Sequence, residues 1–124
     1  MPSRAYPPDT PATRRAAARM EAYARGQKVV TASNTLVKSS DADFVSVAWE
    51  FGTYTGNYTL DIGPVAEFPG RTVTIKDTAG TADDFNIIIN PYGSETIDGA
   101  ATEEINTAYG VVRLRSNGTA WFKV

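Results

Sequence analysis

The fold is decided by the stretch from Arg71 to Val124, which reads RTVTIKDTAGTADDFNIIINPYGSETIDGAATEEINTAYGVVRLRSNGTAWFKV. Val73 and Ile75 alternate there with polar neighbours, and Phe85–Asn90 shows the same period of two, which is typical of an extended strand. Asn117-Gly118 lies between two such runs and predicts a hairpin, because both residues tolerate positive φ. This half of the chain is therefore predicted to be a small β unit.

The residues before this stretch show the same pattern. We predict strands over Lys28–Thr31, Leu36–Lys38, Phe44–Phe51 and the segment from Tyr58 to Ile62. Glu95–Gly99 and Glu103–Thr107 resemble short edge segments with one inward isoleucine each. Strands with turn signals at this frequency predict an all-β fold, a small antiparallel β-sandwich or barrel-like domain.

The N-terminal part has a different character. Met1–Asp9 contains three prolines and few apolar residues, so we expect an extended arm, either disordered or laid along a partner. Thr10–Gly26 is predicted to be one short α-helix, because Thr10 can cap it, Pro11 suits its first position and Gly26 suits its end. The sequence thus divides into an arm and helix over residues 1–28 and a β domain over residues 29–124.

The charge is distributed unevenly along the 124 residues. Residues 1–28 carry six basic and two acidic residues, and residues 29–124 carry six basic and twelve acidic ones, for a net charge of −2. A basic arm on an acidic body indicates different surroundings for the two parts. The apolar stripe of the helix is mostly alanine, which is poorly suited to a membrane, and an acidic body argues against nucleic acid, so we expect neither as a partner.

The composition limits the kinds of catalytic and metal sites that the chain can form. The chain has no cysteine and no histidine, which excludes the usual zinc sites, Ser-His triads and Cys-His pairs. The remaining catalytic candidates are carboxylates near turns of the C-terminal half: Asp77, Asp83, Asp84, Glu95, Asp98, Glu103 and Glu104. A glycan-cleaving enzyme needs two of them facing each other across a groove, and each fits a turn or a strand edge better. The Ser39–Asp43 turn has too few oxygens for a calcium cage. We expect no enzymatic activity, no cofactor and no metal.

Aromatic residues could instead form a platform for a sugar. Trp49, Tyr54, Tyr58, Tyr92, Tyr109 and Trp121 are numerous enough for this. Most of them lie where the alternation places core residues, or near turns, so a purely structural role is the simpler interpretation.

Five pieces of the chain follow one another in a characteristic order. They are Thr74-Ile75-Lys76-Asp77 with Gly80, then Ile87–Pro91, Glu95–Gly99, Tyr109 and Ser116–Trp121. In this order they resemble the β-structured C-terminal module of many tailed-bacteriophage fibre, spike and head-decoration proteins. The resemblance covers roughly residues 45–124. It implies a homotrimeric, non-enzymatic virion part.

From these observations we expect a trimeric head-decoration (cement) or head-spike protein on the outer surface of the capsid. Its N-terminal part would bind the major capsid protein through Tyr6, Arg14, Arg15, Arg19, Met20 and Tyr23, residues to which the resemblance does not extend. The alternative is the receptor-binding module of a tail fibre or spike, with a host-surface glycan as its partner.

Overall fold

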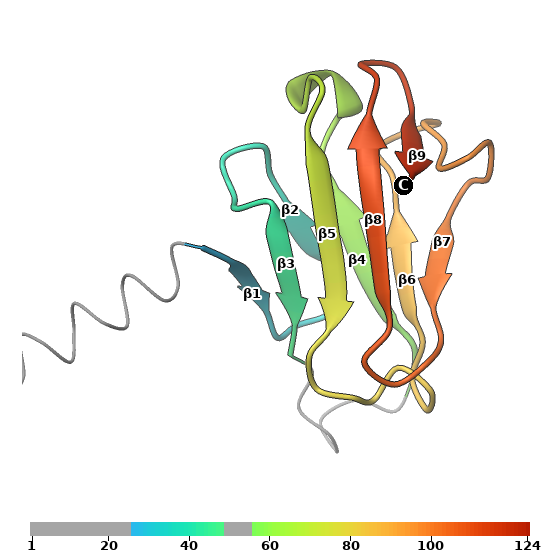
Figure 1. Ribbon diagram of the computed structural model, residues 1–124. Helices are drawn as coiled ribbons and strands as arrows, with labels where there is room; N and C mark the ends of the chain where they lie inside the picture. Colours follow the sequence, from blue (N-terminus) through green and yellow to red (C-terminus); the bar gives the residue numbers. More distant parts are fainter. Residues whose placement is uncertain (1–25, 49–55) are drawn as a thin grey trace, which may run out of the picture.

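The computed structural model describes residues 26–48 and 56–124 (Figure 1). Its elements are β1 (Lys28–Val30), β2 (Thr35–Val37), β3 (Phe44–Val47), β4 (Tyr58–Ile62), the 3-10 turn η1 (Val65–Glu67), β5 (Thr72–Asp77), β6 (Ile87–Asn90), β7 (Glu103–Ile105), β8 (Val111–Ser116) and β9 (Trp121–Lys123). The described part of the chain is all-β, as predicted. None of its helices is long and apolar enough to cross a bilayer.

The first six strands alternate between two sheets. One sheet, sheet A, has the order β1-β3-β5-β8-β9, and the other, sheet B, has the order β2-β4-β6-β7. Figure 1 shows β3, β5 and β8 in front of β2, β4 and β6. The chain therefore winds three times around a common interior, and each turn places one strand in each sheet: β1 and β2, then β3 and β4, then β5 and β6.

This winding makes both sheets mixed. The strands of successive turns run parallel, so β1 pairs with β3, β3 with β5, β2 with β4 and β4 with β6 in parallel. Only β5–β8, β6–β7 and β8–β9 are antiparallel. The predicted antiparallel arrangement is therefore wrong for four of the seven pairs. The error has a physical reason: a period of two identifies which side of a strand is buried, but it says nothing of the direction of the neighbouring strand.

The core fills the space between the sheets. Each strand of the three turns contributes its inward residues, and these form one cluster with Tyr58, Phe68 and Trp121. Val73 and Ile75 are inward and almost fully buried, as the alternation predicts, and so are Ile87 and Ile89. At about 25 cal/mol per Å² of apolar surface, each of these side chains stabilises the folded state by about 1.5–3 kcal/mol.

The corners of successive turns are bonded to one another. Asn34 follows β1 with a φ of 64°, and its N–H donates to the Thr59 carbonyl at 2.7 Å. The Ser33 hydroxyl accepts from Thr59 N–H at 3.0 Å, and the Tyr58 hydroxyl donates to the Ala32 carbonyl. Asn34 can adopt this left-handed conformation because its side chain tolerates it better than most. The corner bonds fix how one turn stacks on the next.

The C-terminal end of the winding is closed by antiparallel pieces. The predicted Asn117-Gly118 turn joins β8 to β9, with Gly118 at a φ of 94°. Asp98-Gly99 forms a two-residue turn in which both φ angles are positive, the geometry of a tight hairpin. Ile97 beside this turn is buried and bridges to Trp121, so the outer edge of β9 is partly covered.

The opposite end of the winding is open. β1 and β2 are the outermost strands of their sheets at this end, and within residues 26–48 and 56–124 no strand pairs with their outer edges. Val29 on β1 is 48% exposed and Leu36 on β2 is 43% exposed. We call this pair of edges, with Val29 and Leu36, the open edge. Unpaired strand edges are sites at which other chains or segments can add.

Some predictions lie outside the described residues. These are the arm Met1–Asp9, the helix Thr10–Gly26 apart from its final glycine, and the end of the predicted strand Phe44–Phe51. The part of that strand that is described, β3, buries Val45 and Val47 as expected.

Candidate functional site

The residues predicted to bind the capsid protein are Tyr6, Arg14, Arg15, Arg19, Met20 and Tyr23. All six lie outside the described residues, so this assignment stays a prediction. The same holds for two members of the predicted aromatic platform, Trp49 and Tyr54.

Asp77, first among the candidate catalytic carboxylates, is an internal anchor. It lies at the end of β5 with a fully buried side chain. Its Oδ1 accepts from Gly80 N–H at 3.0 Å, and its Oδ2 accepts from Ala82 and Tyr109 N–H at 2.9 and 3.1 Å. Three backbone donors thus satisfy a buried charge that would otherwise be costly. The carboxylate ties the β5–β6 connection to the β7–β8 connection, which is a structural task.

Tyr109 completes this anchor. It has a φ of 59°, and its ring lies so close over Gly80 that a Cβ there would come within 2.5 Å of the ring. Gly80 itself has a φ of 77°, which favours glycine. Asp77, Gly80 and Tyr109 therefore meet at one point of the fold. All three belong to the ordered set of segments on which the bacteriophage resemblance rests.

The acidic turn considered for calcium binds an arginine of the chain instead. Arg71 forms an ion pair with Asp43 at 2.5 Å and donates to the Ser39 and Asp41 carbonyls at 2.5 and 3.2 Å. Its guanidinium also lies 4.9 Å from the centre of the Phe68 ring. The described residues contain no group of three or more acidic side chains placed to hold a metal ion.

Other candidate carboxylates serve the backbone or a lysine. Glu95 accepts from Val65 N–H at 3.0 Å, and Asp98 accepts from Lys123 N–H at 3.1 Å. Glu103 pairs with the Lys123 ammonium, and this hydrogen bond and charge raise the pKa of Lys123 above its usual value of 10.5. Carboxylates engaged in this way are not a facing pair across a groove.

The aromatic residues divide between core and surface. Tyr58 and Trp121 are fully buried, and Trp121 meets Phe68 edge-on with ring centres 5.1 Å apart. Of the described members of the predicted platform, Tyr92 and Tyr109 are exposed, at 56% and 59%. Tyr109 belongs to the Asp77 anchor, so Tyr92 is the one described member that is left to meet a ligand.

Tyr92 lines a shallow pocket on the outer side of sheet B. The pocket has a volume of about 310 Å³ and is lined by Leu36, Asp61, Ile62, Asn90, Pro91, Tyr92 and Gly93. The winding builds it, because Leu36 on β2, Asp61 on β4 and Asn90 on β6 are neighbours in register across three parallel strands. Asn90 Nδ2 donates to Asp61 Oδ1 at 3.0 Å. The pocket thus offers fixed polar groups beside an exposed aromatic ring.

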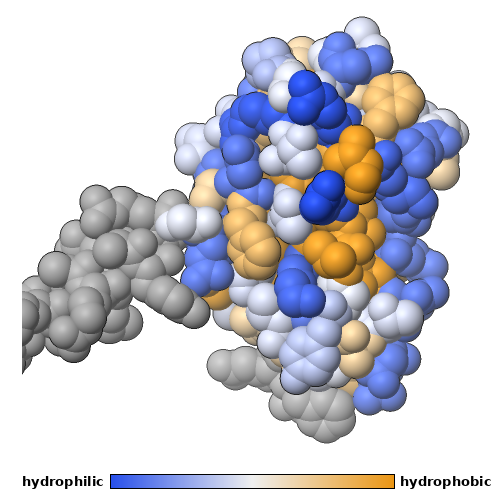
Figure 2. Space-filling view, viewed as in Figure 1, coloured by the Kyte–Doolittle hydropathy of each residue, from blue (hydrophilic) through white to orange (hydrophobic). Residues whose placement is uncertain are grey.

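The outer side of sheet A is different in character. Lys76 on β5 and Arg113 and Arg115 on β8 all point outward there, because they alternate with the buried Ile75 and Leu114. Figure 2 looks onto this side and shows strongly hydrophilic side chains beside apolar ones. Arg113 and Arg115 share one side of β8 because they are two residues apart, and the β5–β8 pairing brings Lys76, which is distant in the sequence, to the same side of the sheet.

Comparison with known proteins adds no relative: no protein-family model matches the chain, and no curated protein sequence matches it significantly.

Proposed function

We propose that the chain is a non-enzymatic structural protein of a tailed-bacteriophage virion. In its most specific form, it is a homotrimeric head-decoration or head-spike protein on the outer surface of the capsid. The N-terminal segment anchors it to the major capsid protein through Arg14, Arg15 and Arg19 and the neighbouring Tyr6, Met20 and Tyr23. The two facing sheets form the sandwich-like body that is displayed.

The observation that carries this proposal is the open edge. It lies directly after the N-terminal segment in the chain, and it presents two half-exposed aliphatic side chains, Val29 and Leu36, beside unpaired strand edges. A soluble protein with such an edge is at risk of uncontrolled association unless a specific partner covers it. In the proposal, the neighbouring protomers of the trimer supply that cover, and the N-terminal segment reaches the capsid.

The use of the carboxylates supports the non-enzymatic part of the proposal. Asp77, Asp98 and Glu95 all accept backbone N–H groups of the protein itself. A general acid or base has to reach a substrate proton, and the fully buried Asp77 does not. In the proposal, the body therefore serves recognition and assembly and not catalysis.

The test separates anchoring from trimer formation with two variants of the full chain. Arg14→Glu/Arg15→Glu/Arg19→Glu is expected to remain trimeric and to lose binding to purified capsids. Val29→Lys/Leu36→Lys is expected to lose the trimer. Light scattering measures the mass, and co-sedimentation measures capsid binding. Val111→Lys/Val124→Lys is the matched control, because Val111 and Val124 are 52% and 60% exposed and lie away from the open edge. A monomeric wild-type protein would contradict the proposal.

A second candidate function is favoured by the pocket on sheet B. A carboxylate, an amide and an exposed tyrosine around one hollow are the groups that hold a sugar hydroxyl and a sugar face. This supports a tail-fibre or spike module that binds a host-surface glycan. Tyr92→Ala would then abolish binding of the protein to host cells, whereas Phe122→Ala, an exposed aromatic on the other sheet, would not. Wild-type binding to cells but not to capsids would place the protein on the tail.

A further inference from the structure

The cations on the outer side of sheet A form a line. Lys76 lies opposite Val111 in the β5–β8 pairing, Arg113 lies opposite Thr74, and Arg115 lies opposite Thr72. Each of three successive outward rows of the sheet therefore carries one cation. Outward rows are about 7 Å apart along a strand. Arg113 and Arg115 follow β8 at this spacing, and Lys76 continues the series in the next row from the neighbouring strand β5.

These cations are not neutralised by neighbouring carboxylates. The ion pairs within the described residues use Lys28, Arg71 and Lys123 and none of the three cations in the line. Asp77 is the one acidic residue in the strands of sheet A, and it points inward. The nearest polar partners are uncharged: Lys76 Nζ donates to the Tyr109 carbonyl at 2.5 Å, and Arg115 Nη1 lies 3.4 Å from Thr72 Oγ1. An acidic body thus carries one strip of unopposed positive charge.

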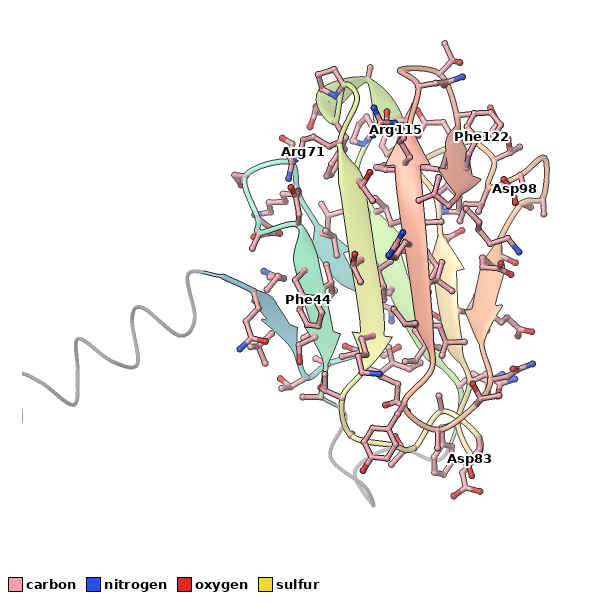
Figure 3. All side chains as sticks on the ribbon, in the orientation of Figure 1. Phe44, Arg71, Asp83, Asp98, Arg115 and Phe122 are labelled. Carbon is pink, nitrogen blue, oxygen red and sulfur yellow. The ribbon has the colours of Figure 1, made fainter. Side chains whose placement is uncertain are left out.

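Two phenylalanines lie on either side of the line. Phe44 on β3 is in the row of Thr74 and Arg113, and Phe122 on β9 pairs with Arg115. Figure 3 shows Phe44 on one side of β5 and β8, and Phe122 beside Arg115 on the other. Phe122 is 42% exposed, and Phe44 is half-buried. Both rings stand on the solvent side of the sheet, where they add nothing to the core.

We propose that this outer side of sheet A binds single-stranded nucleic acid. Such sites combine a track of positive charge for the phosphates with aromatic rings on which bases stack, and a flat β-sheet can provide both. The spacing of the cations is similar to that of consecutive phosphates in an extended single strand. An acidic protein surface would also match the charge, but it would leave the two flanking rings without a partner. The inference goes beyond the proposed function and does not depend on it.

The test measures binding of the full-length protein to a fluorescein-labelled single-stranded dT12 by anisotropy, at several salt concentrations. Each neutralised phosphate of a single strand contributes about −0.7 to the slope of log K against log salt. Three contacts give about −2, which lowers the affinity about 20-fold between 50 and 200 mM salt. Arg113→Gln/Arg115→Gln removes two contacts, so its slope is expected to be shallower by about 1.4.

Phe122 tests the stacking part separately. Phe122→Ala is expected to weaken binding at least about fivefold and to leave the salt slope unchanged, because the ring carries no charge. Phe122→Trp keeps a ring and is expected to keep the affinity. A duplex of the same length should bind more weakly than dT12, because its bases are already stacked.

The matched control is Lys38→Gln/Lys123→Gln, which also removes two positive charges but none from this side of sheet A. It is expected to bind dT12 with the slope of the wild-type protein. Equal slopes for this variant and Arg113→Gln/Arg115→Gln would overturn the proposal, since binding would then follow net charge or another segment. Equal affinity for poly-glutamate and dT12 would also overturn it, because the surface would then fit an acidic protein. No detectable binding of dT12 at 50 mM salt would overturn it directly.

Discussion

Asp77 is expected to be the most costly carboxylate of the described residues to remove. In Asp77→Ala three backbone N–H groups lose their acceptor, those of Gly80, Ala82 and Tyr109. Ala82 is fully buried, so its N–H remains without a partner, at a cost of about 1–3 kcal/mol. Gly80 and Tyr109 are nearer to solvent, so water can replace part of the lost bonds, and each contributes about 1 kcal/mol. The sum is about 3–5 kcal/mol.

A loss of this size is large for a small domain, whose unfolding free energy is typically about 5–15 kcal/mol. It would lower the thermal midpoint by more than about 10 °C. Urea unfolding followed by fluorescence gives the free energy directly. Amide hydrogen exchange adds a local test, because the Ala82 amide should lose its protection in the variant before the strands of the core do.

Two further variants sharpen the measurement. Asp77→Asn keeps the shape but replaces one acceptor with a donor that faces other donors, so we expect a loss of at least about 2 kcal/mol. Asp83→Ala removes an exposed carboxylate from the same β5–β6 connection and is expected to stay within about 0.5 kcal/mol of the wild-type protein. The reasoning would be refuted if Asp77→Ala and Asp83→Ala unfolded at the same urea concentration.

Three other predictions follow from contacts described above. Gly80→Ala should lower the free energy of unfolding by about 2 kcal/mol or more. Adding Tyr109→Ala to this variant should recover only the part of the loss that is due to the steric clash, because the positive φ at Gly80 remains unfavourable. A double-mutant cycle of unfolding free energies measures the coupling. Arg71→Lys should destabilise by about 1–2 kcal/mol in urea, because a lysine keeps the charge but cannot reach Asp43 and both carbonyls together; full stability in this variant would contradict the role of the guanidinium. The ammonium of Lys123 should titrate by NMR with a pKa above 10.5, and this pKa should return towards 10.5 in Glu103→Gln. Because the pKa is raised in the folded state, the contribution of Lys123 to stability is present below pH 10.5 and is lost as the pH rises through the folded pKa. An unchanged titration in Glu103→Gln would show that Glu103 is not the cause.

The positions of the strands could be predicted from the sequence because burial leaves a periodic record. Tyr58, Leu60 and Ile62 alternate with polar residues, and all three are buried on β4. Of the two short edge segments predicted, Glu103–Thr107 contains the edge strand β7, whereas Glu95–Gly99 forms only isolated bridges at Ile97 and a turn; Ile97 and Ile105 both point inward, as predicted. In each case a single local rule, that one side of a strand faces the core, decides the outcome.

The pairing of the strands could not be predicted in this way. β2 and β4 are separated by the whole of β3, which lies in the other sheet. Their parallel pairing depends on how the chain winds, and no local pattern encodes that. The pocket has the same origin, since Leu36, Asp61 and Asn90 become neighbours only through the winding.

The buried position of Asp77 is encoded in the sequence pattern. The residue is in phase with Val73 and Ile75, which places its side chain on the buried side of the same strand. A carboxylate in phase with core residues predicts a buried group that needs several donors, rather than a group that meets a substrate. Arg113 and Arg115 carry the opposite signal, because they alternate with the buried Leu114 and so share one outward side.

The alternation of successive strands between the sheets also has a consequence for how quickly the protein folds. None of the first six strands lies beside its predecessor, so each of the four parallel pairs has to close a long loop before its contacts form. The β8–β9 hairpin is the most local pairing in the described chain, and it is expected to form first. Chains dominated by such distant pairings fold in milliseconds to seconds rather than microseconds. During that time the aliphatic strands of the winding are exposed, and newly made chains are most vulnerable to misassembly.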